Sequence, residues 1–133
     1  MCGIIGYIGQ KNVTEVLLNG LRKLEYRGYD SAGVALLEDN GIEVVKCKGR
    51  LAILEEKLTG NCFGGRIGIG HTRWATHGEP NDSNSHPHLS NSEKIAVVHN
   101  GIIENYLQIK EFLVSKGYRF YSETDSEVVS NLI

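Results

Sequence analysis

The chain has 133 residues, of which 41% are hydrophobic and 23% charged, with 14 Lys and Arg against 16 Asp and Glu. A single domain of this size buries about two-thirds of the surface of its unfolded chain, enough for a core without disulfide or metal. A formal net charge of −2 excludes non-specific binding to nucleic acid or to an anionic membrane as the main activity, because it creates no strong positive field.

The start of the chain and its cysteines indicate the compartment. No apolar run approaches the roughly 20 residues that span a bilayer, and no signal-peptide pattern opens the sequence. The three cysteines, Cys2, Cys47 and Cys62, have no CxxC spacing, which fits neither a disulfide framework nor a compact zinc site. We therefore expect a cytoplasmic protein that makes no contact with a membrane.

The first elements predicted are a strand and a helix. Gly3–Ile8 is apolar on both faces, which is typical of a buried strand. Apolar residues recur at three- and four-residue spacing over 13–24, which predicts an amphipathic helix that ends by Gly28. Ser31–Leu37 and Glu43–Lys48 then form a predicted hairpin, because the residues between them tolerate positive φ.

A second helix and strand follow the hairpin. Leucines spaced over 51–58 predict a short helix that ends near Gly60. In Ile67–His71, isoleucines alternate with Gly68 and Gly70, so one face of this strand is bare backbone. Another element is expected to pack closely against that face.

The last part of the chain begins with a polar segment, Thr72–Ser92, which predicts a long surface loop. A strand over Ile95–His99 and a helix over Glu104–Lys116 are expected next. Asp125–Ile133 predicts a final helix with an apolar face that includes Val128, Val129, Leu132 and Ile133. Because this helix ends without a capping residue, we expect the domain to continue beyond the chain.

Cys2 is the first candidate for chemistry. Removal of Met1 would leave a thiol and a free α-amine on one residue, and an α-amine with a pKa near 7.7–8.0 can accept the thiol proton. The alternative is that Cys2 is a small residue at a strand edge. The pair Asn100-Gly101 after a buried strand offers two donors for an oxyanion hole, although the same pair is common in simple turns.

Charged side chains elsewhere match an amino acid ligand. Arg73 presents a planar fork for a carboxylate, and Trp74, the only tryptophan, could close over a small ligand. Asp125 could pair with an ammonium group. The alternatives are a solvated arginine, a tryptophan that anchors its loop to the core, and a helix-capping aspartate.

The sequence supports a metal site or a phosphate site less well than a site for an amino acid. Five histidines lie within 29 residues, and His86-Pro87-His88 could aim two imidazoles the same way, but no carboxylate or thiol stands at an interval that completes a metal site. No GxGxxG or GxxxxGK[ST] pattern occurs, so a nucleotide phosphate loop is not indicated.

Five segments resemble a known family. Met1–Tyr7 resembles the start of the N-terminal-nucleophile (class II) glutamine amidotransferases. Leu24–Gly33 and His71–Pro80 resemble the branch whose glutaminase domain is joined to a sugar isomerase domain, and His99–Asn105 and Ser122–Asp125 follow in the same order. The resemblance spans the whole chain.

The resemblance implies an α+β fold, the N-terminal-nucleophile hydrolase αββα sandwich, incomplete in this chain. Residues 1–133 would be the N-terminal part of the glutaminase domain, with the sugar isomerase domain absent. The implied activity is hydrolysis of L-glutamine without cofactor or metal, which supplies ammonia for glucosamine 6-phosphate synthesis from fructose 6-phosphate. The full-length enzyme would be a homodimer.

The resemblance also implies a role for each candidate residue. Cys2 would be the nucleophile with its own α-amine as base, and it would form a thioester. Asn100 and Gly101 would form the oxyanion hole. Arg27 would orient the loops of the active site.

The remaining implied residues bind the substrate. Arg73 would bind the α-carboxylate of glutamine and Asp125 its α-ammonium group. Trp74, Thr76 and His77 would line or cover the pocket. Three alternatives stay open: a silent glutamine-binding or oligomerisation fragment, a His-rich metal-binding protein, and the glutaminase domain of another amidotransferase of the same superfamily.

Overall fold

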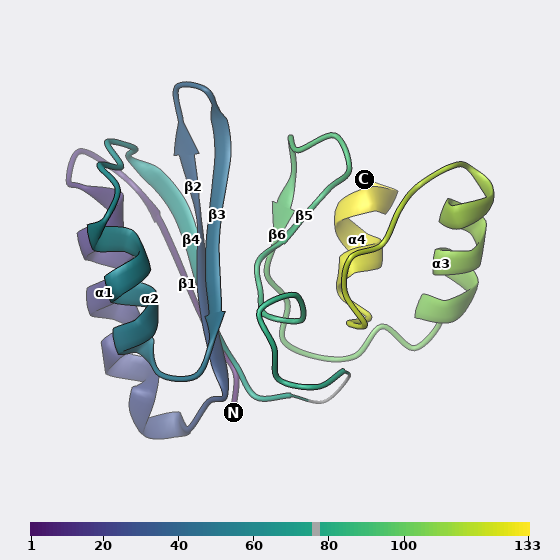
Figure 1. Ribbon diagram of the computed structural model, residues 1–133, viewed down its shortest axis with the longest axis horizontal. Helices are drawn as coiled ribbons and strands as arrows, with labels where there is room; N and C mark the ends of the chain where they lie inside the picture. Colours follow the sequence, from purple (N-terminus) through teal and green to yellow (C-terminus); the bar gives the residue numbers. More distant parts are fainter. Residues whose placement is uncertain (76–77) are drawn as a thin grey trace.

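The structure is a computed structural model that describes residues 1–75 and 78–133. Its elements form successive layers: helices α1 and α2, a first sheet, the strands β5 and β6, and then helices α4 and α3 (Figure 1). The order of the layers is therefore helix, sheet, sheet, helix, which confirms the predicted α+β fold. Among the described residues, no helix has the length and apolar character needed to cross a membrane.

In the described residues, four antiparallel strands form the first sheet in the order β1-β4-β2-β3. The strands span Gly3–Ile8 (β1), Ser31–Glu38 (β2), Gly41–Lys48 (β3) and Ile67–Arg73 (β4). Each lies where the sequence predicts a strand, and β4 extends two residues further. Because β4 is central, its end brings Arg73 next to the start of β1.

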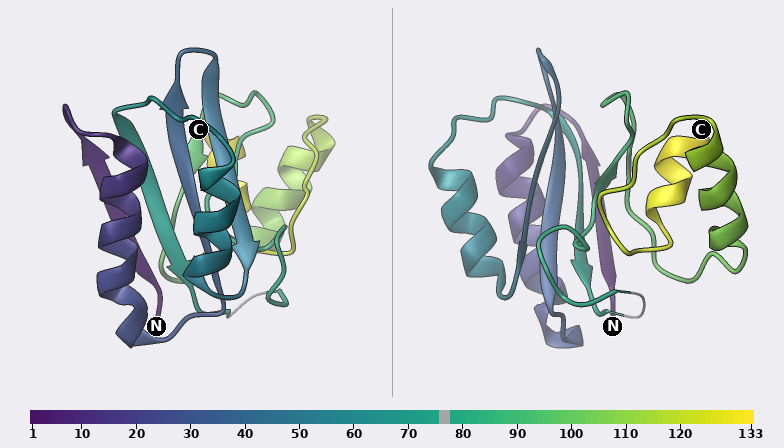
Figure 2. Two further views of the ribbon diagram at one scale, coloured as in Figure 1. Left: turned by 60° about the vertical axis from the view of Figure 1, so that its left-hand side comes forward. Right: turned by 45° about the vertical axis from the view of Figure 1, so that its right-hand side comes forward.

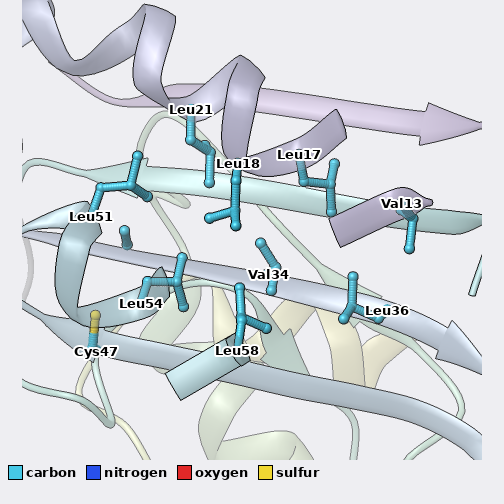
Figure 3. Packing of buried hydrophobic residues seen from close by; sticks show 11 residues of the cluster. Val13, Leu17, Leu18, Leu21, Val34, Leu36, Cys47, Leu51, Leu54 and Leu58 are labelled. Atoms are coloured by element: carbon cyan, nitrogen blue, oxygen red, sulfur yellow. The ribbon is translucent and has the colours of Figure 1, made fainter. Parts of the chain in front are cut away.

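Helices α1 (Val13–Leu24) and α2 (Leu51–Thr59) cover one face of this sheet, as Figure 2 shows from two sides. The side chain of Asn12 caps α1 by accepting from the N–H of Glu15. A 3-10 turn, η1 (Glu25–Arg27), follows α1. Leucines and valines of α1 and α2 pack against those of β2 to form the main core (Figure 3). Its members are Val13, Leu17, Leu18, Leu21, Val34, Leu36, Leu51, Leu54 and Leu58.

The bare face of β4 is where α1 packs. A Cβ on Gly68 would lie 2.8 Å from a methyl of Val13 and 3.0 Å from Leu17. A Cβ on Gly70 would lie 3.3 Å from Leu21. The predicted close approach is confirmed, and the two glycines set the depth at which the helix sits on the sheet.

The segment 72–92 is not the surface loop that the sequence predicts. Asn84, Ser85, His86, His88 and Ser90 are all buried between the first sheet and the C-terminal helices. Polar content is a poor guide here because the segment's own polar groups find partners. Ser85 donates to the carbonyl of Asn81 at 2.8 Å, and the amide of Asn84 donates to the carbonyl of Glu79 at 2.9 Å.

A lysine from the first sheet holds this buried segment. Lys46 donates from Nζ to the carbonyls of Ser83, Ser85 and Pro87 at 3.3, 2.9 and 3.1 Å. Gly33 of β2 makes room for the buried segment, because a Cβ at this position would lie 2.0 Å from the carbonyl oxygen of His86. The segment therefore lies directly on the backbone of β2.

The second sheet is a short pair in the described residues. β5 (His88–Leu89) pairs antiparallel with β6 (Ala96–Val97), so the strand predicted over Ile95–His99 exists but is shorter. Helix α3 (Tyr106–Ser115) also forms where predicted, and Gly117 follows it with φ +94°.

The last helix, α4 (Glu127–Leu132), starts two residues later than predicted and buries a different face. Val128 is buried, but Leu132 and Ile133 are exposed by 53% and 79%. The buried positions next to Val128 are polar, namely Glu127, Ser130 and Asn131. The predicted apolar face was wrong because Glu127 is enclosed by the turn that precedes the helix. Its carboxylate accepts from the N–H of Tyr121 and from the N–H of Ser122.

Candidate active site

A pocket of about 230 Å³ lies where the end of β4 and the start of β1 meet two loops, one at 99–102 and one at 124–126. Its wall comes from several separate parts of the sequence. The residues that line it are Cys2, Arg73, Trp74, His86, His99, Gly101, Ile102, Thr124, Asp125 and Ser126. Five of the nine predicted site residues are in this list: Cys2, Arg73, Trp74, Gly101 and Asp125.

Cys2 is held by the backbone of Trp74. The pairing of Gly3 with Thr72 brings the residue before β1 next to the residue after β4. The Trp74 N–H donates to Sγ of Cys2 at 3.2 Å, and the thiol donates to the Trp74 carbonyl at 3.6 Å. The thiol is half-buried, which leaves one side of the sulfur open to the pocket.

The amino terminus lies beside this thiol. The Met1 ammonium group donates to the carbonyls of Arg27 and Gly28, each at 3.0 Å. The Arg27 guanidinium contacts Sδ of Met1 at 2.7 Å. The Arg27 side chain therefore contacts the first residue of the chain and does not line the pocket.

Arg73 and Asp125 place one positive and one negative group in the pocket, with only 4% and 3% of their surfaces exposed. Arg73 donates from Nη2 to the Gly78 carbonyl at 3.3 Å. Asp125 accepts from the N–H of Ile103 at 2.6 Å. Both side chains thus have fixed positions, as recognition of a zwitterion requires.

The structure decides three of the alternatives raised by the sequence. Arg73 is not a solvated arginine, because it is buried at a strand end. Asp125 is not a side-chain cap of the last helix, because the N-cap is Ser126 and no side chain caps that end. Trp74 is 55% exposed, so it does not anchor its loop to the core.

Gly101 and Asn100 differ in their relation to the pocket. Gly101 lines it with φ +139°, a conformation that L side chains rarely adopt. Asn100 lies beside the wall, between His99 and Gly101, and its Oδ1 is 2.7 Å from Nε2 of His71. Thr76 and His77, predicted to bind substrate, lie outside the described residues.

Three buried histidines form the floor behind the pocket. His71 stacks on His86 with ring centroids 4.3 Å apart, and His86 meets His88 edge-on at 4.5 Å. Burial lowers the pKa of His71 to about 4 and that of His88 to about 3, and burial also lowers the pKa of His86. All three imidazoles are neutral at pH 7.

His86 and His88 also form hydrogen bonds with neighbouring segments. Nε2 of His88 lies 2.7 Å from Oγ1 of Thr124, and Nδ1 of His86 accepts from the N–H of His99 at 3.4 Å. In the described part of the chain, no three His, Cys, Asp or Glu residues are placed to hold a metal ion together.

Sequence reasoning missed part of the wall. Five lining residues were not predicted to line a pocket: His86, His99, Ile102, Thr124 and Ser126. The cluster of histidines was a usable signal for His86 and His99, but it suggested only a metal site. The other three carry no pattern that distinguishes them from ordinary loop residues.

Comparison with known proteins agrees with this geometry. Residues 58–133 match the family model of the glutamine amidotransferase domain. The chain is 68% identical over 133 residues to glutamine–fructose-6-phosphate aminotransferase (isomerizing) of Clostridium perfringens and 56% identical to that of Thermus thermophilus. Each match covers the whole of this chain and 22% of the relative, so the chain spans about a fifth of their length.

Solved structures of more distant proteins share the fold. Glutamine phosphoribosylpyrophosphate amidotransferase from B. subtilis, complexed with ADP and GMP, superposes with a TM-score of 0.78 at 26% identity. A structure described as the allosteric regulatory enzyme of purine biosynthesis gives 0.80 at 27% identity. Each covers 98% of this chain, and this chain covers 28% of each.

The chain belongs to the glutamine amidotransferase domain family. Within that family it is homologous to the glutaminase domain of glutamine–fructose-6-phosphate aminotransferase (isomerizing). The identification made from Leu24–Gly33 and His71–Pro80 is therefore confirmed, and so is the enzyme class.

Proposed function

We propose that this chain hydrolyses the side-chain amide of L-glutamine to glutamate and ammonia. The observation that carries the proposal is the meeting of Cys2, Arg73 and Asp125 in one pocket, since they come from distant parts of the sequence. A thiol, a buried cation and a buried anion match the amide, the α-carboxylate and the α-ammonium group of one glutamine molecule.

The reaction begins after Met1 is removed. The Cys2 thiol gives its proton to its own α-amine, and Sγ forms a bond with the amide carbon of glutamine. The resulting oxyanion accepts hydrogen bonds from Nδ2 of Asn100 and the N–H of Gly101. The C–N bond then breaks, and ammonia leaves with the proton held by the α-amine.

Water completes the cycle. It attacks the thioester carbon, the same donors stabilise the second oxyanion, and glutamate leaves as the Cys2 thiol is restored. Arg73 and Asp125 hold the two charged groups of the substrate throughout. We assign substrate binding to Thr76 and His77 as well as to Trp74, on the family resemblance, and to Arg27 the role of orienting the loops near the amino terminus.

The fate of the ammonia belongs to the same proposal. It rests on the relatives' names, which contain fructose 6-phosphate, and on the family resemblance of the sequence. Residues 1–133 are the N-terminal part of the glutaminase domain, and a sugar isomerase domain of the full-length protein uses the ammonia to convert fructose 6-phosphate to glucosamine 6-phosphate. The full-length protein is a homodimer and acts in the cytoplasm.

The test is the intact mass of the full-length protein before and after exposure to 6-diazo-5-oxo-L-norleucine, an electrophilic glutamine analogue. A matched sample that keeps Met1 is the control, and methionine aminopeptidase converts it to the processed form. The processed sample is expected to gain one adduct, mapped to Cys2, and L-glutamine is expected to slow its formation.

The other thiols provide an internal control. Cys62 is exposed and Cys47 is buried, and neither lines the pocket. An adduct on Cys62 at the same rate as on Cys2 would contradict recognition of the glutamine skeleton. A processed sample with no adduct and no ammonia release would instead indicate the silent glutamine-binding protein.

A further inference from the structure

His71 lies behind the pocket and contacts a residue that the proposed reaction uses. It is in the middle of the active-site side of β4, its surface is fully buried, and it does not line the pocket. Its Nε2 is 2.7 Å from Oδ1 of Asn100. No substrate atom can reach the imidazole directly, so any effect on the reaction passes through its neighbours.

The orientation of the Asn100 amide in the structure requires the proton of the His71 imidazole to be on Nε2. The partner of Nε2 is an oxygen, and a short contact between nitrogen and oxygen requires a hydrogen between them. Nδ1 faces the backbone of His99, an interaction that raises the pKa of the ring, and makes no fully formed hydrogen bond to a described residue. Burial has the larger effect and keeps the ring neutral at pH 7, so the ring carries one N–H, which the contact with Oδ1 of Asn100 places on Nε2.

We propose that His71 is a positioning residue that fixes the orientation of the Asn100 side-chain amide. The proposal rests on the proposed function, in which Nδ2 of Asn100 stabilises the oxyanion. An amide presents a donor at one end and an acceptor at the other. Because Oδ1 is bound to His71, Nδ2 is the end left for the substrate, whereas a flipped amide would present a lone pair that repels an oxyanion.

The ring that orients Asn100 is itself held on two sides. His86 stacks against it with an interplanar angle of 20°, and His86 in turn accepts from the N–H of His99, next to Asn100 in the chain. On the strand beside it, Gly33 pairs with His71 and leaves the space in which the His86 carbonyl lies. His71 therefore has a fixed place from which it can select one amide orientation.

The test compares His71→Gln with His71→Asn in the full-length protein. The terminal N–H of glutamine reaches about as far as Nε2 of histidine, whereas that of asparagine is one methylene short. We expect His71→Gln to keep kcat for glutamine within about fivefold, and His71→Asn to lose about 10- to 100-fold in kcat with KM within about threefold, because one oxyanion-hole donor is worth about 10²–10³ in kcat.

Thr72→Val is the matched control. Thr72 is the next residue of β4, is equally buried, faces α1 instead of the pocket, and has no hydrogen-bond partner for its hydroxyl among the described residues. It is expected to keep the kcat of the parent. Urea unfolding of every variant shows that the proteins compared are folded.

A double-variant cycle tests whether His71 acts through Asn100. In the Asn100→Ala background, His71→Asn is expected to cost less than twofold in kcat, because the amide it orients is gone. If the two losses multiply, His71 does not act through Asn100 and the proposal fails. If Asn100→Ala alone leaves kcat unchanged, the oxyanion role in the proposed function fails.

Two further results bear on His71 alone. A loss of more than 20-fold in kcat for His71→Gln would overturn the proposal, since the donor is still present. A His71→Asn variant that keeps kcat within about threefold of the parent would overturn it as well, since the donor is then out of reach of Asn100.

Discussion

The backbone N–H of Trp74 donates a hydrogen bond to Sγ of Cys2 across 3.2 Å, so the residue that follows β4 fixes the thiol that precedes β1. This contact needs no particular side chain at position 74. It follows from the antiparallel pairing that begins at Gly3 and Thr72. The position of the Cys2 thiol is therefore a property of the sheet.

Cys2→Ala in the full-length protein is expected to abolish ammonia release from glutamine, by at least about 10³-fold, because it removes the thiol that forms the acyl intermediate in the proposed reaction. Alanine is small enough that Met1 is still removed. Calorimetric titration with L-glutamate is expected to show binding like that of the parent, since Arg73 and Asp125 remain. Cys62→Ala, at an exposed position, is the control and should keep full activity.

Asp125→Asn is expected to raise KM for glutamine about 10- to 100-fold, because a charge-assisted hydrogen bond to the substrate ammonium is lost. The amide can still accept from the N–H of Ile103, so the loop is preserved. The measurement compares glutamine with its analogue that lacks the α-amino group. The variant and the parent should hydrolyse this analogue equally well.

Glu123→Gln is the matched control for Asp125→Asn. It removes one negative charge from the same turn, at a residue that does not line the pocket. Equal effects of the two variants on KM would mean that the net charge of the loop, and not a direct contact of Asp125, attracts the substrate.

Gly33→Ala is expected to lower the free energy of unfolding by roughly 2–3 kcal/mol and to reduce glutaminase activity. The new methyl group would lie 2.0 Å from the His86 carbonyl and 2.7 Å from Cβ of Lys46, so the buried segment must move off β2. Urea denaturation and kcat for glutamine measure the two effects. Gly60→Ala, where nothing lies within 4 Å of the added methyl, is expected to change neither.

Stability is expected to fall as the pH drops from about 6.5 towards 4. The pKa values of His71, His86 and His88 are all lowered by burial, so in this window the unfolded chain binds three protons that the folded chain does not. The free energy of unfolding should then decrease by about 4 kcal/mol per pH unit near pH 5.5, a slope of about 1.4 kcal/mol for each proton.

His88→Gln checks this slope. It keeps a side-chain amide that can reach Oγ1 of Thr124, but it removes one titrating group. The slope between pH 6 and 5 should fall to about two-thirds of that of the parent. An unchanged slope would mean that His88 is protonated in the folded state and that its pKa is not lowered.

The fold could be predicted from the sequence wherever local pattern and tertiary environment agree. The alternation of glycine in β4 and the spacing of Leu17 and Leu21 in α1 each indicate the contact that the structure contains. Local pattern failed for segment 72–92, because hydrogen bonds from Lys46 allow polar residues to be buried. It failed again for α4, where the carboxylate of Glu127 is enclosed and Leu132 is exposed.

The candidate site was predicted in part. Cys2, Arg73 and Asp125 were identified by the chemistry of their side chains and by family resemblance, and the structure brings them into one pocket. His71 was predicted only as part of a strand and as one of the five histidines considered for a metal site. Its role depends on a contact with Asn100, 29 residues away, and no property of a single sequence reveals such a pair.

The wide separation of the pocket residues in the sequence has a consequence for biosynthesis. Cys2 leaves the ribosome more than a hundred residues before Asp125, which at 5–20 residues per second is roughly 6–25 s earlier. Throughout that interval Cys2, Arg73 and Asp125 are not yet together in one pocket. Under the proposed function, Met1 therefore has time to be removed before the pocket that would bind glutamine is complete.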